Sequence, residues 1–293
     1  MSLHRILIAL SLGCGAVFAQ AAAQLLVDAD WLSAHLHDKN MVVLHAGPAQ
    51  DYEANHIPGA RRLSAGDLSK PANHENPKDL SLELPAMEEL RSKLAAAGIS
   101  DDSRIVVTYS RPEMFPGATR VVLTLVYAGL GDRVSILNGG LPAWTGAGKP
   151  VSTAAADVTP GKLSARPPKS VVVDADFVKS LNGRSHYKLV DARAPVYFNG
   201  TEDTYKKSGH IPGAVNIPFT EILDNTGRVD KAKVAALFEK AGIGNGDTVV
   251  AYCHIGLQAT AVIFGARLVG HPAVLYDGAF QDWAINERGP VEK

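Results

Sequence analysis

Short apolar runs alternate with amphipathic stretches along the chain. Two stretches, residues 87–97 and 231–241, carry apolar side chains at three- and four-residue spacing and are followed by Gly98 and Gly242, as helices are at their C-termini. The apolar runs have the length and composition of buried strands, at 42–44, 105–109, 189–190 and 248–252. Strands that alternate with helices indicate a parallel sheet covered on both faces, so we expect an α/β fold.

This pattern occurs twice in the chain. "HIPGARRLSAGDLS" at 56–69 is answered by "HIPGAVNIPFTEIL" at 210–223, and we read "SRIVVTYS" as answered by "GDTVVAYC", which sets Ser110 opposite Cys253. "GDRVSILNGGLPAW" is likewise answered by "GHPAVLYDGAFQDW", which sets Trp144 opposite Trp283, and we expect both tryptophans to anchor cores. The landmarks recur in the same order, so the sequence predicts a duplicated domain.

The two copies are separated by a segment with the composition of a linker. Residues 151–169 are rich in Pro, Ser, Ala and Thr and show no apolar period. We therefore expect one domain at 24–150 and a second at 170–293, each a parallel sheet flanked by helices. With 293 residues and 46% hydrophobic content, the chain is long and apolar enough for two such cores.

The N-terminal residues 1–23 resemble a cleavable secretory signal. Arg5 precedes an apolar run at 6–18, and small residues follow it. A membrane anchor is less favoured because the run is shorter than the roughly 18 residues that a spanning helix needs. A lipoprotein anchor at Cys14 is less favoured because Ser11 stands where leucine is expected. We expect a periplasmic protein with no membrane attachment after cleavage, in which Cys253 is the remaining cysteine.

Charge and composition exclude several classes of function. Lys and Arg number 29 against 30 Asp and Glu, and no basic block interleaved with aromatic residues occurs, which argues against a nucleic-acid partner. The sequence contains no Cys-x-x-Cys pair, no His/Cys cluster with metal-ligand spacing, and no glycine-rich nucleotide-binding motif. We therefore expect neither a metal nor a cofactor.

The stretch "VVAYCHIGLQATA" at 249–261 places Cys253 between the end of a predicted strand and the start of a predicted helix. Chemistry gathers at the carboxyl ends of strands in open α/β sheets. The backbone amides of the following residues can converge there on the sulfur, and a helix N-terminus lowers a cysteine pKa from about 8.5. Tyr252 faces the other way and packs. The predicted loop comprises His254, Ile255, Gly256, Leu257, Gln258 and Ala259.

Other enzymes with a cysteine in this setting need residues that this chain lacks. A tyrosine phosphatase requires an arginine that closes the loop, and Ala259 stands six positions after Cys253. What is left is a nucleophilic thiolate that accepts a sulfur atom, holds it as a persulfide and passes it on. The alternative is a buried cysteine without chemistry.

The motifs "VDAR", "SGHIPGAVNIPF", "AYCHIGLQA" and "LYDGAFQDW" resemble the tandem-domain rhodanese family of sulfurtransferases, over nearly all of the chain after the signal. The resemblance implies that the second domain is catalytic and that the first has lost its cysteine at Ser110. It also implies that Cys253 takes sulfur from a small anionic donor, thiosulfate or 3-mercaptopyruvate. A thiophilic acceptor such as cyanide or a thiol then removes the sulfur, and a protein acceptor stays open.

Two departures from the family leave the donor undecided. The pair after the cysteine is His254 and Ile255, which matches neither the Arg-Lys of vertebrate thiosulfate enzymes nor the Gly-Ser of mercaptopyruvate enzymes. Tyr197 stands where the vertebrate enzymes carry an arginine, and Arg111 supplies that charge if its loop faces the site. A protonated His254 would help to bind an anion, and an outward, solvated ring is the alternative.

The strand-end pair Asp191 and Arg193 also belongs to the predicted site. We favour a structural ion pair that supports the loop over direct contact with substrate. His210 is favoured as a hydrogen-bond anchor over a base, because its counterpart His56 persists in the half without a nucleophile. The rival to an enzyme is a non-catalytic sulfur carrier, redox sensor or protein-binding module.

Overall fold

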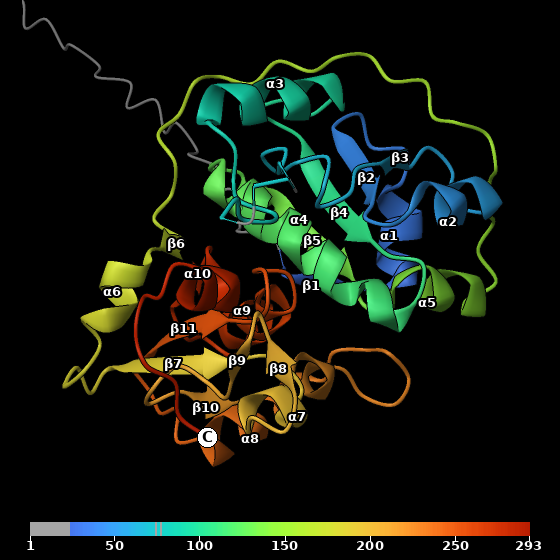
Figure 1. Cartoon of the computed structure of the whole chain (residues 1–293). Coiled ribbons are helices and arrows are strands. Elements are labelled where there is room, and N and C mark those ends of the chain that lie inside the picture. The colour runs from blue at the N-terminus through green and yellow to red at the C-terminus, as the bar shows by residue number, and fades with distance from the viewer. Residues whose placement is uncertain (1–23, 74, 77) are drawn as a thin grey trace, which may run out of the picture.

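The computed structural model describes residues 24–73, 75–76 and 78–293, and the predicted signal at 1–23 lies outside them. Each half of the chain folds around a parallel five-stranded sheet, so the expected α/β fold is confirmed (Figure 1). The first sheet has the order β1-β5-β4-β2-β3, and its strands are β1 Leu26–Val27, β2 Met41–His45, β3 Arg61–Arg62, β4 Arg104–Thr108 and β5 Val134–Leu137.

The second sheet repeats this topology, with β11, the strand that precedes Cys253, in the centre. Its order is β10-β7-β11-β12-β6, and its strands are β6 Val172–Val173, β7 Tyr187–Asp191, β10 Val215–Asn216, β11 Thr248–Tyr252 and β12 Ala273–Tyr276. A separate antiparallel pair, β8 Asp203–Thr204 with β9 Lys207–Ser208, occurs in this half of the described chain. All four predicted strands are present: β11 has the predicted bounds, β4 is shifted by one residue, and β2 and β7 are longer than predicted by two and three residues.

Helices cover both faces of each sheet. The predicted helices at 87–97 and 231–241 are present as α3 Met87–Ala96 and α8 Lys231–Lys240. The other helices are α1 Ala29–His35, α2 Ala49–Ala54, α4 Phe115–Tyr127 and α5 Gly140–Gly146 in the first half, and α6 Ala175–Lys179, α7 Pro195–Phe198, α9 Ala259–Leu268 and α10 Ala279–Ile285 in the second. Short 3-10 helices lie at Pro112–Met114, Gly131–Arg133 and Phe219–Ile222.

The two domains pack against each other through α4 and α9, so that one apolar core runs across both. Phe115 of α4 meets Phe264 of α9 edge to face, with ring centroids 5.9 Å apart. Nearly all of α4 is buried, which a helix covering only its own sheet would not require. The helix α9, which begins six residues after Cys253, is therefore fixed by the first domain as well as by its own sheet.

The duplication extends to individual contacts. His56 and His210 each donate a hydrogen bond from Nδ1 to a carbonyl oxygen, of Tyr52 and Phe198 respectively, and each ring stacks on that aromatic residue with ring centroids 3.8 Å apart. The two tryptophans are likewise buried in equivalent settings, and each indole donates to a proline carbonyl oxygen six or seven residues later. The predictions that His210 anchors a loop and that the tryptophans anchor cores are confirmed.

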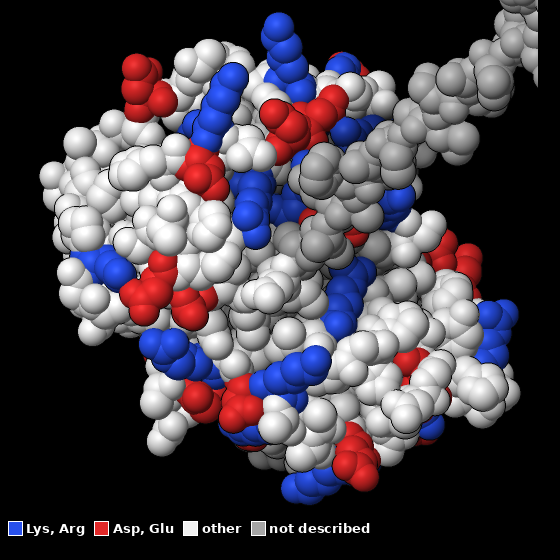
Figure 2. All heavy atoms as spheres, turned by 180° about the vertical axis from the view of Figure 1, so that it is seen from behind, with Lys and Arg blue, Asp and Glu red and all other residues white. Residues whose placement is uncertain are grey.

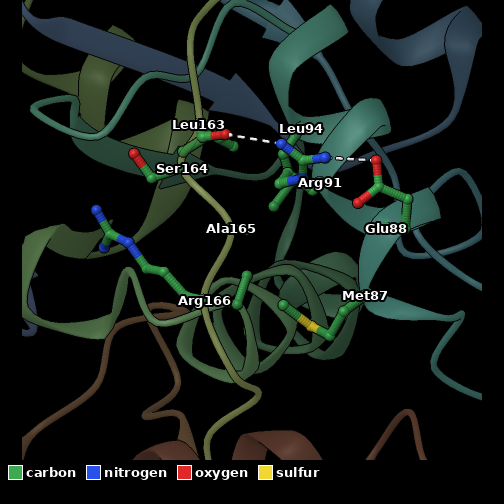
Figure 3. A pocket seen from close by; sticks show the side chains of 9 residues that line it. Met87, Glu88, Arg91, Leu94, Leu163, Ser164, Ala165 and Arg166 are labelled. Carbon is green, nitrogen blue, oxygen red and sulfur yellow. Dashed lines mark hydrogen bonds and ion pairs between the residues drawn. The ribbon is translucent and has the colours of Figure 1, made fainter.

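The connecting segment runs around the outside of the first domain before it enters β6 (Figure 1). It is held there by polar contacts, since Arg91 of α3 donates to the carbonyl oxygen of Leu163 at 3.2 Å and Arg166 pairs with Asp101 at 2.6 Å. A small hollow between this segment and α3 is shown in Figure 3, where Arg91 also pairs with Glu88. Charges of both signs are interspersed on the face shown in Figure 2. Among the described residues, no helix is long and apolar enough to cross a membrane.

Candidate functional site

Cys253 lies at the carboxyl end of β11, directly before the loop that leads into α9. Its side chain is 0% exposed, and the backbone amides of Ala259, Ile255, Gly256 and Gln258 donate hydrogen bonds to its sulfur. Gly256 has φ +76°, a conformation in which glycine carries no steric penalty and which lets the loop curl around the sulfur. The predicted convergence of loop amides on Cys253 is thus present in the structure.

The predicted lowering of the Cys253 pKa is wrong for the resting thiol. Burial raises the pKa of Cys253, because an isolated thiolate loses its hydration in this site, and the loop amides lower it by a smaller amount. The sequence argument counted the amides and the helix terminus but had no measure of desolvation. The site therefore holds a neutral thiol at rest, surrounded by donors that are aimed at an anion.

Asp191 and Arg193 form a buried, multiply hydrogen-bonded ion pair at the end of β7, the strand next to β11. Nε of Arg193 donates to both carboxylate oxygens at 3.0 Å, and Nη2 donates to Oδ2 at 2.6 Å and to the carbonyl oxygen of Gly209 at 2.8 Å. The guanidinium lies 3.9 Å from the centre of the Phe280 ring. These contacts engage Arg193 within the domain, which is the arrangement expected of a structural pair.

Both sequence-based alternatives for His254 are wrong. Burial, followed by the nearby positive charge of Arg193, lowers the pKa of His254 to about 4, so the ring is neutral at neutral pH. The ring is also not directed into solvent. It is partly buried, it meets Tyr197 edge to face at 4.7 Å, and its Nδ1 lies 3.3 Å from the hydroxyl of Thr204.

The hairpin formed by β8 and β9 is a part of the site that the sequence argument missed. Its two turn residues, Tyr205 and Lys206, have φ of 57° and 61°, which is unusual for residues other than glycine. Tyr205 interacts electrostatically with Cys253, and this effect adds to burial in raising the pKa of Tyr205. A signal was available, because four positions separate Tyr52 from His56 while twelve separate Phe198 from His210. The hairpin occupies that extra length.

The expected equivalence of Ser110 with Cys253 is wrong by one residue. The Tyr109 carbonyl oxygen accepts from the Leu141 amide as the Cys253 carbonyl oxygen accepts from the Phe280 amide, so Tyr109 stands opposite Cys253 and Ser110 opposite His254.

The loop after β4 in the first domain is closed by its own contacts. Ser110 donates to Asp51, and Arg111 forms an ion pair with the same carboxylate. The expectation that Arg111 serves the Cys253 site is therefore not supported, since its charge is matched within the first domain. His45 stands where the second domain has Asp191, and burial lowers its pKa to about 4.

The first domain nevertheless contributes to the loop around Cys253. Arg120 of α4 donates from Nη1 to the carbonyl oxygen of Gly256 at 3.1 Å and pairs with Asp277 at 2.8 Å. The hydroxyls of Thr119 and Thr260 meet across the same interface at 2.7 Å. In the described parts of the chain, no group of three or more His, Cys, Asp or Glu side chains is arranged to bind a metal ion.

Comparison with known proteins identifies the class to which this fold and cysteine loop belong. The family model for the rhodanese-like domain matches the chain twice, at residues 28–147 and 174–286. A probable 3-mercaptopyruvate sulfurtransferase of Pseudomonas aeruginosa is 34% identical over 292 residues, covering 92% of this chain and 98% of the relative. The thiosulfate sulfurtransferase of Gallus gallus is 28% identical over 288 residues, covering 90% and 95%.

The crystal structure of SseA from Escherichia coli, a 3-mercaptopyruvate enzyme, superposes with a TM-score of 0.76 at 28% identity, covering 88% of this chain and 99% of that one. A complex of EanB with ergothioneine, covalently linked to a cysteine persulfide, has a TM-score of 0.81 at 25% identity, covering 92% and 70%. The chain is a tandem-domain sulfurtransferase. It belongs to the rhodanese family, as the resemblance in its motifs predicts.

Proposed function

We propose that Cys253 is the sulfur-carrying nucleophile and that its donor is 3-mercaptopyruvate. The observation that carries the first part is the ring of amides on a cysteine that follows the central strand β11. When the donor enters, the Cys253 sulfur bonds to the donor sulfur as the donor carbon–sulfur bond breaks. The carbon leaves with the electron pair and takes the proton that the Cys253 thiol gives up as the new sulfur–sulfur bond forms, which gives pyruvate and the Cys253 persulfide. The loop amides stabilise the sulfur-centred charge that develops, as an oxyanion hole does for oxygen.

The second half-reaction regenerates the free thiol of Cys253 from the persulfide. A thiophilic acceptor such as cyanide or a thiol bonds to the outer sulfur, the sulfur–sulfur bond breaks, and the Cys253 thiolate is released and protonated. The raised pKa of the resting thiol supports this order, because the site reprotonates readily after discharge.

The charge of the site favours a donor with a single carboxylate over dianionic thiosulfate. Residues 254–259 contain neither lysine nor arginine, and His254 is neutral. Arg193 is engaged by Asp191, and Arg120 by Asp277. Lys206, on the turn next to Tyr205, has no ion pair among the described residues. We assign the exposed Lys206 amine to the donor carboxylate, and several relatives are named as 3-mercaptopyruvate enzymes.

The donor is tested by steady-state kinetics with cyanide as acceptor. We expect kcat/KM with 3-mercaptopyruvate to exceed that with thiosulfate by at least tenfold. Equal values, or a preference for thiosulfate, would overturn the donor assignment while leaving the nucleophile to be tested separately.

We further propose that residues 1–23 direct export to the periplasm of a Gram-negative cell. Support comes from Arg5 ahead of the apolar run at 6–18 and the small residues that follow. The test is the intact mass of the protein recovered from the periplasmic fraction. This mass should correspond to a chain without residues 1–23. A full-length protein in the cytosolic fraction would contradict the proposal.

A redox-sensing module is less well supported. Sensor cysteines are accessible and of low pKa, whereas Cys253 is fully buried and its pKa is raised.

A further inference from the structure

Arg120 is a fully buried residue of the first domain whose guanidinium reaches into the catalytic loop of the second. Besides Gly256 and Asp277, it donates from Nη2 to the carbonyl oxygen of Leu82. The guanidinium thus joins three segments, which are the loop after β11, the loop after β12, and a strap of the first domain at 81–84. A buried arginine with this set of partners has a defined position, because each contact restricts it in a different direction.

The strap itself is fixed to the second domain on both sides of Leu82. The amide of Ser81 donates to Gln281 at 2.9 Å, and the amide of Leu84 donates to Asp277 at 3.0 Å. Leu82 has φ 58°, a left-handed conformation that is unfavourable for a residue other than glycine. Its carbonyl oxygen is held in this orientation by Arg120. The first domain therefore contacts the region beside the loop around Cys253 through backbone amides of the strap as well as through the Arg120 guanidinium.

The bond from Arg120 bears directly on the amides around the sulfur. Gly256 is one of the residues whose N–H donates to Cys253, and its carbonyl oxygen is the acceptor for Arg120. Holding that oxygen fixes the Gly256–Leu257 peptide plane, which lies between the Gly256 amide and the Gln258 and Ala259 amides that donate to the sulfur. Gly256 packs tightly against its neighbours, since a Cβ at this position would lie 3.1 Å from the Asp277 carbonyl oxygen and 3.2 Å from Nη1 of Arg120. The orientation of backbone N–H groups decides how well a site stabilises an anion.

We propose that Arg120 is a positioning residue for sulfur transfer: it holds the Gly256–Leu257 peptide so that the amides on either side of it converge on the sulfur of Cys253. The domain without a nucleophile thereby sets the reactivity of the nucleophile in the other domain. This inference rests on Cys253 being the sulfur carrier.

A residue that only joins the two domains would affect stability but not the reactivity of Cys253. The chain offers a matched control for such a residue. Asn138 of the first domain also bridges the interface, but to the loop that covers the inactive site. Its amide donates to the carbonyl oxygen of Val229 at 3.1 Å, and its carbonyl oxygen accepts from the Val229 amide at 2.8 Å. Asn138→Ala removes an interdomain contact without touching the loop around Cys253.

The test compares Arg120→Lys and Arg120→Met with Asn138→Ala in the mature protein. Two rates are measured on folded protein: single-turnover loading of sulfur onto Cys253, followed by intact mass, and alkylation of Cys253 by iodoacetamide as a function of pH. We expect both Arg120 variants to load about tenfold to a hundredfold more slowly, since loss of one such donor in related anion sites costs about a hundredfold or more. We also expect the alkylation midpoint to move to higher pH.

The groups that face the loop and can affect this midpoint are Tyr205 of the hairpin, His254, the Asp191–Arg193 pair, and Arg120 with Asp277. The variants change only Arg120, and Arg120→Lys keeps the positive charge, so a shift in that variant reports geometry. Asn138→Ala should lower the melting temperature with no shift of the midpoint and parent-like loading.

Parent-like loading and an unchanged midpoint in Arg120→Lys would overturn the proposal, as would equal effects in Asn138→Ala. If Arg120→Met does not fold, Arg120→Lys and Asp277→Asn carry the comparison. Because alkylation does not require a sulfur donor, its result stands even if the assigned donor is wrong.

Discussion

Asp191 and Arg193 are joined by a bidentate ion pair in which both side chains are almost fully buried. The same pair is held at its backbone, since the side-chain amide of Asn216 donates to the carbonyl oxygens of both residues at 2.9 and 3.0 Å. The end of β7 is thereby fixed beside the end of β11, where Cys253 follows Tyr252.

Arg193→Ala should cost more in stability than in rate. Removal of one partner leaves Asp191 buried and unpaired, so we expect the free energy of unfolding to fall by about 3–5 kcal/mol. Chemical denaturation measures this change, and turnover per folded molecule should fall by less than about tenfold. The control is Arg166→Ala, which breaks a more exposed ion pair with Asp101 and should cost less than about 1 kcal/mol. A large rate loss at parent stability would assign Arg193 to the substrate instead.

His254 should stay neutral throughout the range in which the enzyme works. Its folded-state pKa is lowered from 6.5 to about 4, so its contribution to stability is present above pH 6.5 and is lost as the pH falls toward 4. An NMR titration of the ring should show a midpoint near 4, and kcat/KM should show no inflection near 6.5. A midpoint at 6 or above would mean that the ring is solvated or paired with an anion.

The Cys253 thiol should titrate at or above the value of a free cysteine. Its pKa is raised by burial, so the thiol form stabilises the fold below the unfolded-state pKa, and this stability is lost as the pH rises through the folded-state pKa. The measurement is the rate of iodoacetamide alkylation from pH 6 to 10, which should rise steadily into the alkaline range. A plateau reached below pH 7 would show that the amides outweigh the burial.

Lys206→Ala should weaken donor binding with little effect on the fold. Loss of one charge-assisted contact to a carboxylate raises KM for 3-mercaptopyruvate by about tenfold, with a smaller change in kcat. The matched control is Lys207→Ala, because the Lys207 amine already donates to the carbonyl oxygen of Gly289. Identical kinetics for the two variants would exclude the hairpin cation as the donor contact.

The sequence predicted the fold and the main landmarks of the site because these depend on local signals. Apolar periodicity located α3, α8 and the central strands, whereas the repeat as read from the sequence set Ser110 opposite Cys253, one residue away from Tyr109, which the structure places there. The direction of the Cys253 pKa could not be obtained in this way, because desolvation depends on what the folded chain packs over the sulfur. The role of Arg120 is hidden for a similar reason, since its partners lie 38 and 136 positions away and are brought together only by domain packing.

The most direct test of the account is the mass of the protein after exposure to a donor. Mature protein and its Cys253→Ser variant are each incubated with 3-mercaptopyruvate without reductant, weighed intact, and then treated with cyanide. We predict that the parent gains one sulfur atom and loses it to cyanide as thiocyanate, while Cys253→Ser keeps the fold and gains nothing. A variant that still acquires sulfur, or a parent with a free thiol that acquires none, would contradict the assignment of Cys253 as the sulfur carrier.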